Sequence, residues 1–303
     1  MKKIFISLVI VFTAYSYAFG QEKSNIKRDT TKGFDFFFNA GMYVGNKKNA
    51  NYYRGIPNSM ESDYADPNIM YVLGTGFFRQ QIMDIILDNY NAENDTSKLK
   101  WNDLSGMRYT ASMSFGIGIR YRFGKNLSIG VVLTQARMTA QGTAYLGVKI
   151  YETNSNDEVK CGLVGKERRT AFELIANYIF PTQSMVSPFL EVGLHVNNTK
   201  VVSSNVIVEN HSFTMINLYG PNHDPTITQT QLNPRLGGVG YGFSAAFGLR
   251  ISFNKWAAIE PTAQFRLEKV NLAGYNSMTP NYNFMIRLVI GDKIFAKKVA
   301  KSE

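Results

Sequence analysis

A chain of 303 residues with a single cysteine, Cys161, cannot hold an internal disulfide framework, and we interpret this cysteine as an inert thiol in a loop. The formal net charge of +10 is unevenly spread, because Lys2 and Lys3 open the chain and four more lysines crowd its end, at positions 293, 297, 298 and 301. No basic stripe interleaved with aromatic residues is left in between, which argues against nucleic-acid binding.

The first twenty residues have the order of a secretory signal peptide. Two lysines precede an apolar stretch from Ile4 to Phe12, and a short segment ending at Gly20 precedes the polar Gln21. The apolar stretch is too short to span a bilayer as a helix. We therefore expect residues 1–20 to be a cleaved signal peptide and residues 21–32 to be a periplasmic N-terminal segment.

Alternation of apolar and polar residues is the strongest pattern after the signal. Odd positions from Tyr109 to Phe123 are apolar or aromatic, whereas the even positions are arginine, threonine, serine and glycine; Val239 to Phe253 repeats the scheme. Weaker alternation marks six more segments, at 34–44, 127–133, 172–180, 190–196, 257–267 and 282–290. These eight candidate strands predict an all-β fold, an up-and-down antiparallel transmembrane β-barrel of about eight strands over residues 33–291.

Connection lengths orient this predicted barrel. Long connections at 45–106, 154–161 and 209–236 alternate with short ones at 124–126, 181–185 and 254–255, and a modest loop at 274–279 comes last. Outer-membrane barrels have short periplasmic turns and longer external loops. We therefore expect the long loops outside the cell, and residues 292–303 to form a lysine-rich periplasmic tail.

The first long loop is predicted to contain a short amphipathic helix between Phe77 and Asn91. Its apolar residues recur at helical spacing; they are Phe77, Phe78, Ile82, Ile85, Ile86 and Tyr90. A loop of this length is far above the usual connection, which suggests a function. The helix is expected either to cover the barrel mouth as a lid or to offer a surface to another protein or a ligand.

The polar faces of the strands are predicted to line the barrel interior with charge. The charged positions are Asp35, Arg108, Arg120, Arg122, Glu173, Glu191, Arg250, Glu260, Arg266, Glu268 and Arg287. An eight-stranded interior is only just wide enough for side chains to fill, and buried charges there must pair. We expect a salt-bridged plug, with a selective path or a gate as the alternative.

The histidines provide no convincing catalytic or metal site. Glu191 and His195 share one strand face, as two members of a proton relay could, but no nucleophile motif completes the set. His211 and His223 lack metal-ligand spacing. We expect no enzymatic activity, no catalytic residue, no cofactor and no metal.

The signal peptide, the eight alternating strands, the turns Gly124 to Asn126 and Asn254 to Trp256, and the interior arginines and glutamates together resemble a known superfamily. It is the small eight-stranded outer-membrane β-barrel superfamily that includes the transmembrane domain of outer membrane protein A. The resemblance is architectural and covers nearly all of the mature chain. It implies the cell outer membrane as the location and outer-membrane lipid as the surroundings of the barrel.

Three functions remain open, because members of this superfamily are structural proteins, adhesins, small-solute carriers or accessory parts of secretion machinery. The first is a non-enzymatic structural or surface-interaction protein whose outer loops contact a protein partner. The second is a narrow channel or carrier for a small solute through the charged interior. The third, an accessory component of a secretion system, rests on the tail. Too few residues follow position 291 for a wall-binding domain, so wall anchoring is not expected.

Overall fold

The computed structural model describes residues 32–56, 67, 69–74, 76–90, 100–102, 106–124, 126–149, 156–182, 184–216, 236–254 and 256–292. The predicted signal peptide lies outside the described residues, as does the predicted tail apart from Asp292.

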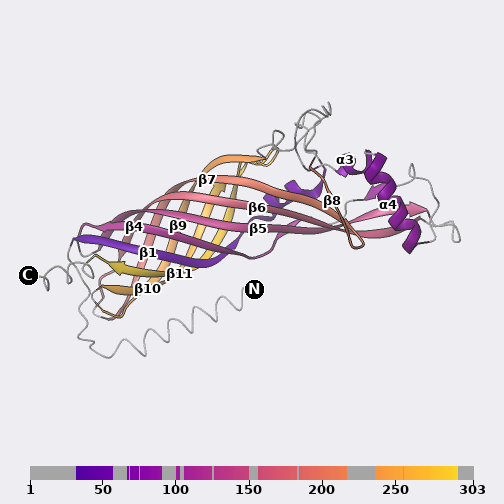
Figure 1. The fold of residues 1–303 in the computed structure, drawn as a ribbon. Coiled ribbons are helices and arrows are strands. Elements are labelled where there is room, and N and C mark those ends of the chain that lie inside the picture. The colour runs from indigo at the N-terminus through magenta and orange to yellow at the C-terminus, as the bar shows by residue number, and fades with distance from the viewer. Residues whose placement is uncertain are drawn as a thin grey trace, which may run out of the picture.

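Eight antiparallel strands form a closed ring (Figure 1). In chain order they are β1 (Gly33–Val44), β4 (Ser112–Arg122), β5 (Leu127–Lys149), β6 (Asn156–Ile179), β7 (Val186–Val208), β9 (Gly237–Ser252), β10 (Ala257–Lys269) and β11 (Met278–Gly291). Each pairs with the next, and β11 pairs with β1 over the register that places Phe38 opposite Leu288. The predicted up-and-down barrel of eight strands is confirmed.

The short connections all lie at one end of the ring. Phe123 donates its backbone N–H to Leu127 across the β4–β5 turn, and Phe253 does the same to Ala257 across the β9–β10 turn. Gly33, the first residue of β1, is paired with Arg122 at this end. An even number of strands returns the chain to the side where it entered.

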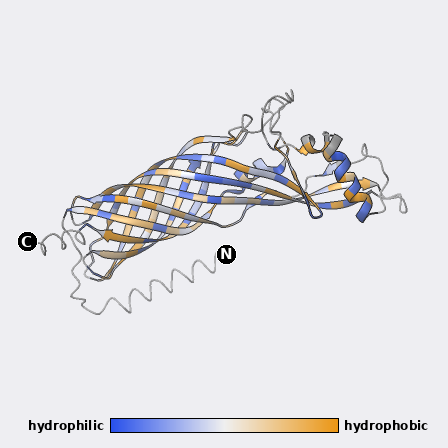
Figure 2. Cartoon of the chain, viewed as in Figure 1, coloured by the Kyte–Doolittle hydropathy of each residue, from blue (hydrophilic) through white to orange (hydrophobic). Residues whose placement is uncertain are grey.

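Residues of the barrel wall alternate between two environments (Figure 2). Outward side chains are large and apolar yet exposed, among them Phe36, Ile117, Val192 and Ile286, which are 43–61% exposed. Inward side chains are mostly polar and buried. An exposed apolar wall is costly in water but is the surface that hydrocarbon requires, and closure gives each strand a hydrogen-bonded neighbour on both sides.

Three strands continue far beyond the barrel. β5, β6 and β7 have 23, 24 and 23 residues, about twice the 9–11 residues that a tilted strand needs to cross the hydrocarbon. Two short strands extend this sheet: β2 (Lys100–Asn102) pairs with β5, and β8 (His211–Thr214) pairs with β7. We call this extension, together with the helices on it, the head.

The polarity of the strand faces inverts where the barrel passes into the head. On β5 the outward face changes from Leu133 to Gln135 and Arg137, while the inward face changes from polar Thr134 to buried apolar Leu146. β6 changes in the same way on both faces. Water replaces lipid outside at this level, and an apolar core replaces the charged interior.

A β-bulge shifts the register between β6 and β7 where the barrel passes into the head. Lys166 pairs with Ser203 but the next residue, Glu167, pairs with Val201, so Val202 is an extra residue in β7. The bulge changes the inward positions of β7 from odd to even, because a slip of one residue moves side chains to the opposite face. Val206 and Val208 therefore join the apolar core of the head.

The long first loop supplies the helices. α2 (Lys47–Ala50) and the 3-10 helix η1 (Asn51–Arg54) lie at the barrel mouth, while α3 (Ile69–Gly74) and α4 (Gly76–Asn89) pack on the head (Figure 1). α4 matches the helix predicted between Phe77 and Asn91. Within the described residues, no helix is both long and apolar enough to cross a membrane.

The interpretation of Cys161 as a loop residue is wrong. It lies within β6, fully buried in the core of the head, because β6 begins sixteen residues before Phe172, where alternation is first evident in the sequence. The segment 209–236 likewise is not all loop, since β8 forms a hairpin with β7.

Candidate functional site

Charged side chains fill the barrel interior in equal numbers of each sign among the described residues. Six arginines and six carboxylates are buried: Asp35, Arg120, Arg122, Glu167, Arg169, Glu173, Glu191, Arg250, Glu260, Arg266, Glu268 and Arg287. Removing an ion from water costs several kcal/mol, so such a set is stable only when the charges are paired and hydrogen-bonded.

At the end with the short turns, three arginines surround two carboxylates. Arg120 binds Glu260 through both terminal nitrogens and holds Asp35 through Nε at 3.2 Å. Arg250 Nη1 bridges the same two carboxylates at 3.2 and 3.1 Å, and Arg122 Nε lies 3.2 Å from Asp35. These pairs cross the ring between β1, β4, β9 and β10.

In the middle of the barrel, Arg287 forms a two-pronged contact with Glu191. Its Nη1 and Nη2 donate to the two carboxylate oxygens at 2.8 and 3.0 Å, and its Nε donates to Asn39 at 3.1 Å. The ring of Phe37 lies 4.7 Å under this guanidinium. Phe37 itself packs inside the barrel in a small apolar cluster with four other buried side chains, Val132, Ile175, Ala258 and Val289.

Above this level, Glu173 and Glu268 continue the network. Glu173 accepts hydrogen bonds from Arg266 and Gln264, both at 2.9 Å, and from Ser244. Glu268 accepts from Tyr43, from Asn281 and from Arg169, and it also contacts His195 Nε2 at 2.9 Å. The filled interior therefore extends nearly to the mouth.

The first loop closes the mouth with a tyrosine. Tyr53, in η1, donates to Glu167 at 2.6 Å, and Tyr109 donates to the same carboxylate oxygen at 3.0 Å. Burial and the neighbouring carboxylate raise the pKa of Tyr53 well above its usual range, which keeps its proton available for this bond. Gly165 is required here, because a Cβ at that position would lie 2.1 Å from the Tyr53 ring.

Of the eleven interior charges predicted from sequence, the structure places ten inside the barrel and one outside. Arg108 is exposed on β3 (Arg108–Tyr109). β3 and β4 pair with β5 in registers that differ by one residue, so the inward face switches from even positions in β4 to Tyr109 in β3.

Glu167 and Arg169 are two further interior charges, which the strand predicted from Phe172 onward does not include. Both occupy odd positions of β6, the same face as Glu173, so extending the alternation before Phe172 could have found them. The candidate relay of Glu191 and His195 is not assembled, since Glu191 binds Arg287 and His195 contacts Glu268. Across the described residues, no group of three or more histidine, cysteine, aspartate or glutamate side chains could hold a metal ion.

The helix predicted either as a lid or as a contact surface does not lie over the mouth. Ile82 and Ile86 of α4 are buried in the core of the head, and Phe78 meets Phe213 of β8 edge to face at 6.0 Å. Tyr90, just after α4, donates to Glu209 at 2.6 Å, a bond that raises the pKa of Tyr90. Ile85 is partly buried, and Phe77 lies in α4. The segment over the mouth is instead Lys47–Arg54, because its tyrosines fit the barrel opening.

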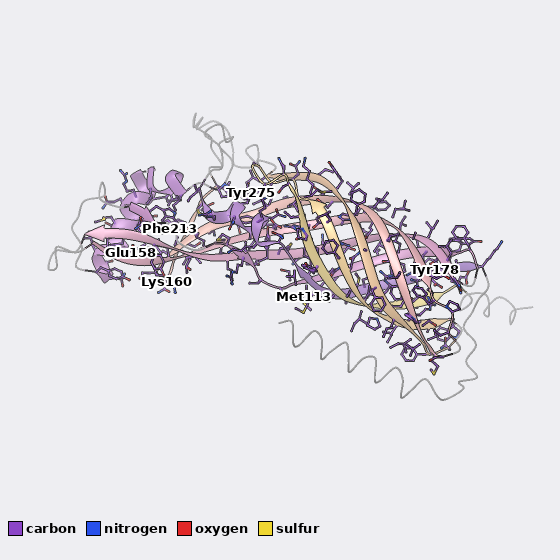
Figure 3. The ribbon with its side chains drawn as sticks, turned by 180° about the vertical axis from the view of Figure 1, so that it is seen from behind. Met113, Glu158, Lys160, Tyr178, Phe213 and Tyr275 are labelled. Carbon is purple, nitrogen blue, oxygen red and sulfur yellow. The ribbon has the colours of Figure 1, made fainter. Side chains whose placement is uncertain are left out.

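A groove of about 520 Å³ runs between α4 and the β7–β8 hairpin. Its lining mixes aromatic, acidic and hydroxyl groups: Phe78, Gln81, Asp84, Ile85, Asn205, His211, Ser212, Phe213 and Thr214. Phe213 lies at the head, far from Tyr178 at the opposite end of the molecule (Figure 3). The groove is therefore the candidate contact site of the head.

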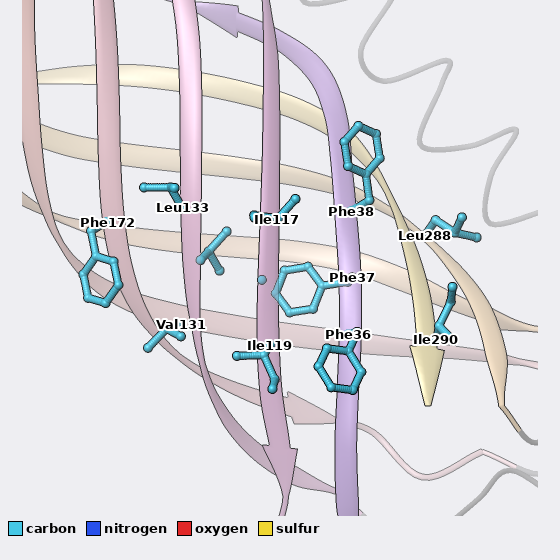
Figure 4. Close-up of a pocket in the computed structure, with 12 residues that line it drawn as sticks. Phe36, Phe37, Phe38, Ile117, Ile119, Val131, Leu133, Phe172, Leu288 and Ile290 are labelled. Atoms are coloured by element: carbon cyan, nitrogen blue, oxygen red, sulfur yellow. The ribbon is translucent and has the colours of Figure 1, made fainter. Parts of the chain in front are cut away.

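A second hollow, of about 560 Å³, lies on the outside of the barrel wall (Figure 4). Phe36, Ile117 and Leu133 are among the residues around it, and its lining is almost wholly apolar. It belongs to the surface that faces hydrocarbon, where such a depression is filled by a lipid chain.

Comparison with known proteins adds a limited likeness. No family model matches the chain, and no curated protein matches it. Among solved structures, Neisserial surface protein A is 10% identical with a TM-score of 0.41, over 85% of this chain and 96% of that one. The outer membrane protein OprG from Pseudomonas aeruginosa is 10% identical with a TM-score of 0.34, over 88% and 97%. On the evidence of its own closed ring and lipid-facing wall, this chain is a small eight-stranded β-barrel of the cell outer membrane.

Proposed function

We propose that this barrel is a non-enzymatic surface protein whose head contacts a protein partner outside the cell. The observation that carries the proposal is the length of β5, β6 and β7, which is about twice what the membrane requires. The extra half of each strand supports a packed core with helices, rather than an irregular loop. A structure of this size outside the membrane has no part in anchoring the barrel.

The interior supports a scaffold better than a channel. Arg120 and Arg287 are each 1% exposed, and both are held by carboxylates from other strands. Breaking a buried ion pair costs about 3–5 kcal/mol, so a solute path through this network would need several such costs at once. Tyr53 and Glu167 add a further closure at the mouth.

The groove between α4 and the β7–β8 hairpin is the proposed contact surface. Gln81, Asp84 and His211 are exposed along it, beside the aromatic pair Phe78 and Phe213. Aromatic anchors rimmed by polar groups are the usual composition of a protein interface.

Photo-crosslinking from the head tests this proposal. A photoreactive residue replaces Gln81 in the groove or, as the control, Lys160 on the outward face of β6, and intact cells are irradiated. We expect a discrete adduct from position 81 alone, lost when Asp84→Ala and His211→Ala are added. Equal adducts from both positions, or an adduct from position 81 that survives both substitutions, would reject the groove as the contact surface.

A further inference from the structure

The outer face of the three long strands bears a row of cations. Arg137 of β5 lies directly opposite Arg168 of β6, which in turn lies directly opposite Lys200 of β7. All three side chains are exposed, and the strands are side by side in Figure 1. Lys166 is exposed on the same face of β6, one pleat farther from the barrel. Neighbouring strands are about 4.8 Å apart, so the three cations of the row span about 10 Å.

These charges repel one another and have no partner in the described part of the chain. Like charges directly opposite on neighbouring strands are destabilising. No described carboxylate lies within 4 Å of Arg137, Arg168 or Lys200, although salt bridges are plentiful inside the barrel. The nearest acid in sequence, Glu167, points inward to Tyr53 and Arg169. An arrangement of this kind is stabilised when an anion lies across the row.

The row lies just outside the lipid-facing belt. The last apolar pair of the outward face is Leu133 opposite Phe172, and Arg137 and Arg168 follow four residues farther along β5 and β6. Four residues of strand rise about 13 Å, which is about 10 Å along the membrane normal at the tilt of a barrel strand. Glu167 and Arg169, which flank Arg168, contact the residues that close the barrel mouth. The cations are therefore level with the headgroups of the outer leaflet.

The surroundings of the row suit an amphiphile. A groove of about 630 Å³ has Arg137, Arg168 and Lys200 in its lining, together with the exposed apolar Val202. Glu167 also lines it, but its carboxylate is held by Tyr53 and Arg169. Toward the membrane, Leu133 and Phe172 also line the apolar hollow on the barrel wall. By contrast, the outward residues at the outer ends of three other strands are apolar, namely Val44, Val239 and Met278.

We propose that Arg137, Arg168 and Lys200 bind the phosphorylated headgroup of an acylated outer-leaflet glycolipid. Arginine pairs with phosphate through two parallel N–H bonds, and lysine adds a point charge. The acyl chains pass Leu133 and Phe172 toward the apolar hollow. The lipid is fixed on one side of the barrel, which orients the head relative to its neighbours in the membrane.

Binding of bisphosphorylated lipid A to the full-length protein in detergent tests this, measured by native mass spectrometry. The row variant carries Arg137→Gln, Arg168→Gln and Lys200→Gln. The matched control carries Lys48→Gln, Arg108→Gln and Lys160→Gln, which removes the same charge at exposed positions away from the row. We expect at least tenfold weaker binding in the row variant and less than a twofold change in the control, with wild-type binding that weakens as salt rises.

Three outcomes would overturn the proposal. The first is equal lipid binding by the two triple variants. The second is that wild type binds the dephosphorylated lipid as tightly as the phosphorylated lipid. The third is that wild type binds inorganic phosphate as tightly as the lipid, which would indicate a simple anion site. Because the row variant lacks the repulsion among the three cations, we expect it to be at least as stable as wild type in the absence of lipid. If it fails to fold, the single Arg168→Gln variant takes its place, with a loss of at least threefold expected and an unchanged affinity counting against the site.

Discussion

At the scale of single residues, the decisive feature is that nearly every buried charge has an opposite partner. Alternation in the sequence was sufficient to place Arg120, Glu260 and Arg287 inside the barrel, because a continuous strand leaves only two faces. It misplaced Arg108, since a register difference of one residue between β3 and β4 exchanges the faces and leaves no mark in the sequence. It also could not show which charges pair, because most partners come from distant strands.

Replacing Arg120 with alanine should destabilise the barrel strongly. The substitution leaves Glu260 buried among fewer donors, so we expect a loss of about 3–5 kcal/mol in the free energy of unfolding. Urea unfolding in detergent, followed by the gel shift of the heated barrel, measures this loss. The control Arg108→Ala removes an exposed arginine and should change stability by less than about 0.5 kcal/mol. Comparable losses in both variants would contradict the buried network.

Cys161 should resist thiol reagents in the folded protein and weaken the fold at alkaline pH. Burial in the head, followed by the nearby Glu209 carboxylate, raises the pKa of this thiol from 9.0 to about 12. The folded state thus holds a proton that the unfolded state loses, and the thiol's contribution to stability, complete below pH 9, is lost as pH rises toward 12.

Maleimide labelling and unfolding midpoints at pH 8 and pH 11 check this prediction. Labelling at pH 8 should require denaturant. Between the two pH values, wild type should lose more stability than Cys161→Ala, because the variant lacks the thiol but keeps every other group that titrates at alkaline pH. Rapid labelling of the folded protein would show that the thiol is accessible. Identical losses of stability in both proteins would show that folding does not raise the pKa of the thiol.

At the scale of elements, the helix α4 was predictable but its position was not. Its apolar residues recur at helical spacing, so Phe77 to Asn91 was identified within two residues of the observed ends. The surface that it covers depends on the outward extension of β6 and β7, which the sequence suggests only weakly, because their inward faces change there from charged to apolar. Periodicity alone does not distinguish a short apolar run in a buried strand from one in a buried helix.

Truncating the buried face of α4 should loosen the head without opening the barrel. Ile82→Ala and Ile86→Ala remove side chains that are 1% and 0% exposed, each at a cost of about 2–5 kcal/mol. Limited proteolysis of the folded protein should then cleave near α4, while the heat-dependent gel shift of the barrel persists. The exposed control Asp84→Ala should remain resistant. Loss of the gel shift in the double variant would mean that barrel and head do not unfold separately.

At the scale of the whole molecule, a barrel filled with paired charges carries a head whose inward face is apolar and whose outward face is polar, the inverse of the faces of the barrel. The ring of eight strands could be predicted from alternation and loop lengths, because alternation reflects which strand face meets lipid. The head could not be predicted, because the packing among β5–β8 and α4 involves residues far apart in the sequence. The cation row at the boundary likewise depends on register, since Arg137, Arg168 and Lys200 are neighbours only across strands.

A sealed interior predicts the absence of ion conduction. Purified wild-type protein in a planar bilayer should give no steady conductance at neutral pH, because Arg120, Glu260 and their partners occupy the interior and Tyr53 closes the mouth. The variant Glu167→Gln, which loses the carboxylate charge at the mouth but keeps Arg169, should also remain closed, because the ion pairs deeper in the barrel are intact. Reproducible wild-type channels with a single conductance value, which changes in this variant, would instead support a selective path.

The inversion of strand faces is tested most directly by labelling single cysteines along the outward face of β5 in intact cells. In a Cys161→Ala background, a membrane-impermeant maleimide should leave Ile129→Cys and Leu133→Cys unlabelled, because lipid covers these positions. Gln141→Cys and Tyr145→Cys should label fully, since they lie on the water-exposed face of the head, which the orientation predicted from the loop lengths places outside the cell. Labelling at positions 129 and 133, or protection at 141 and 145 that ends only when the cells are lysed, would contradict a membrane barrel with an external head.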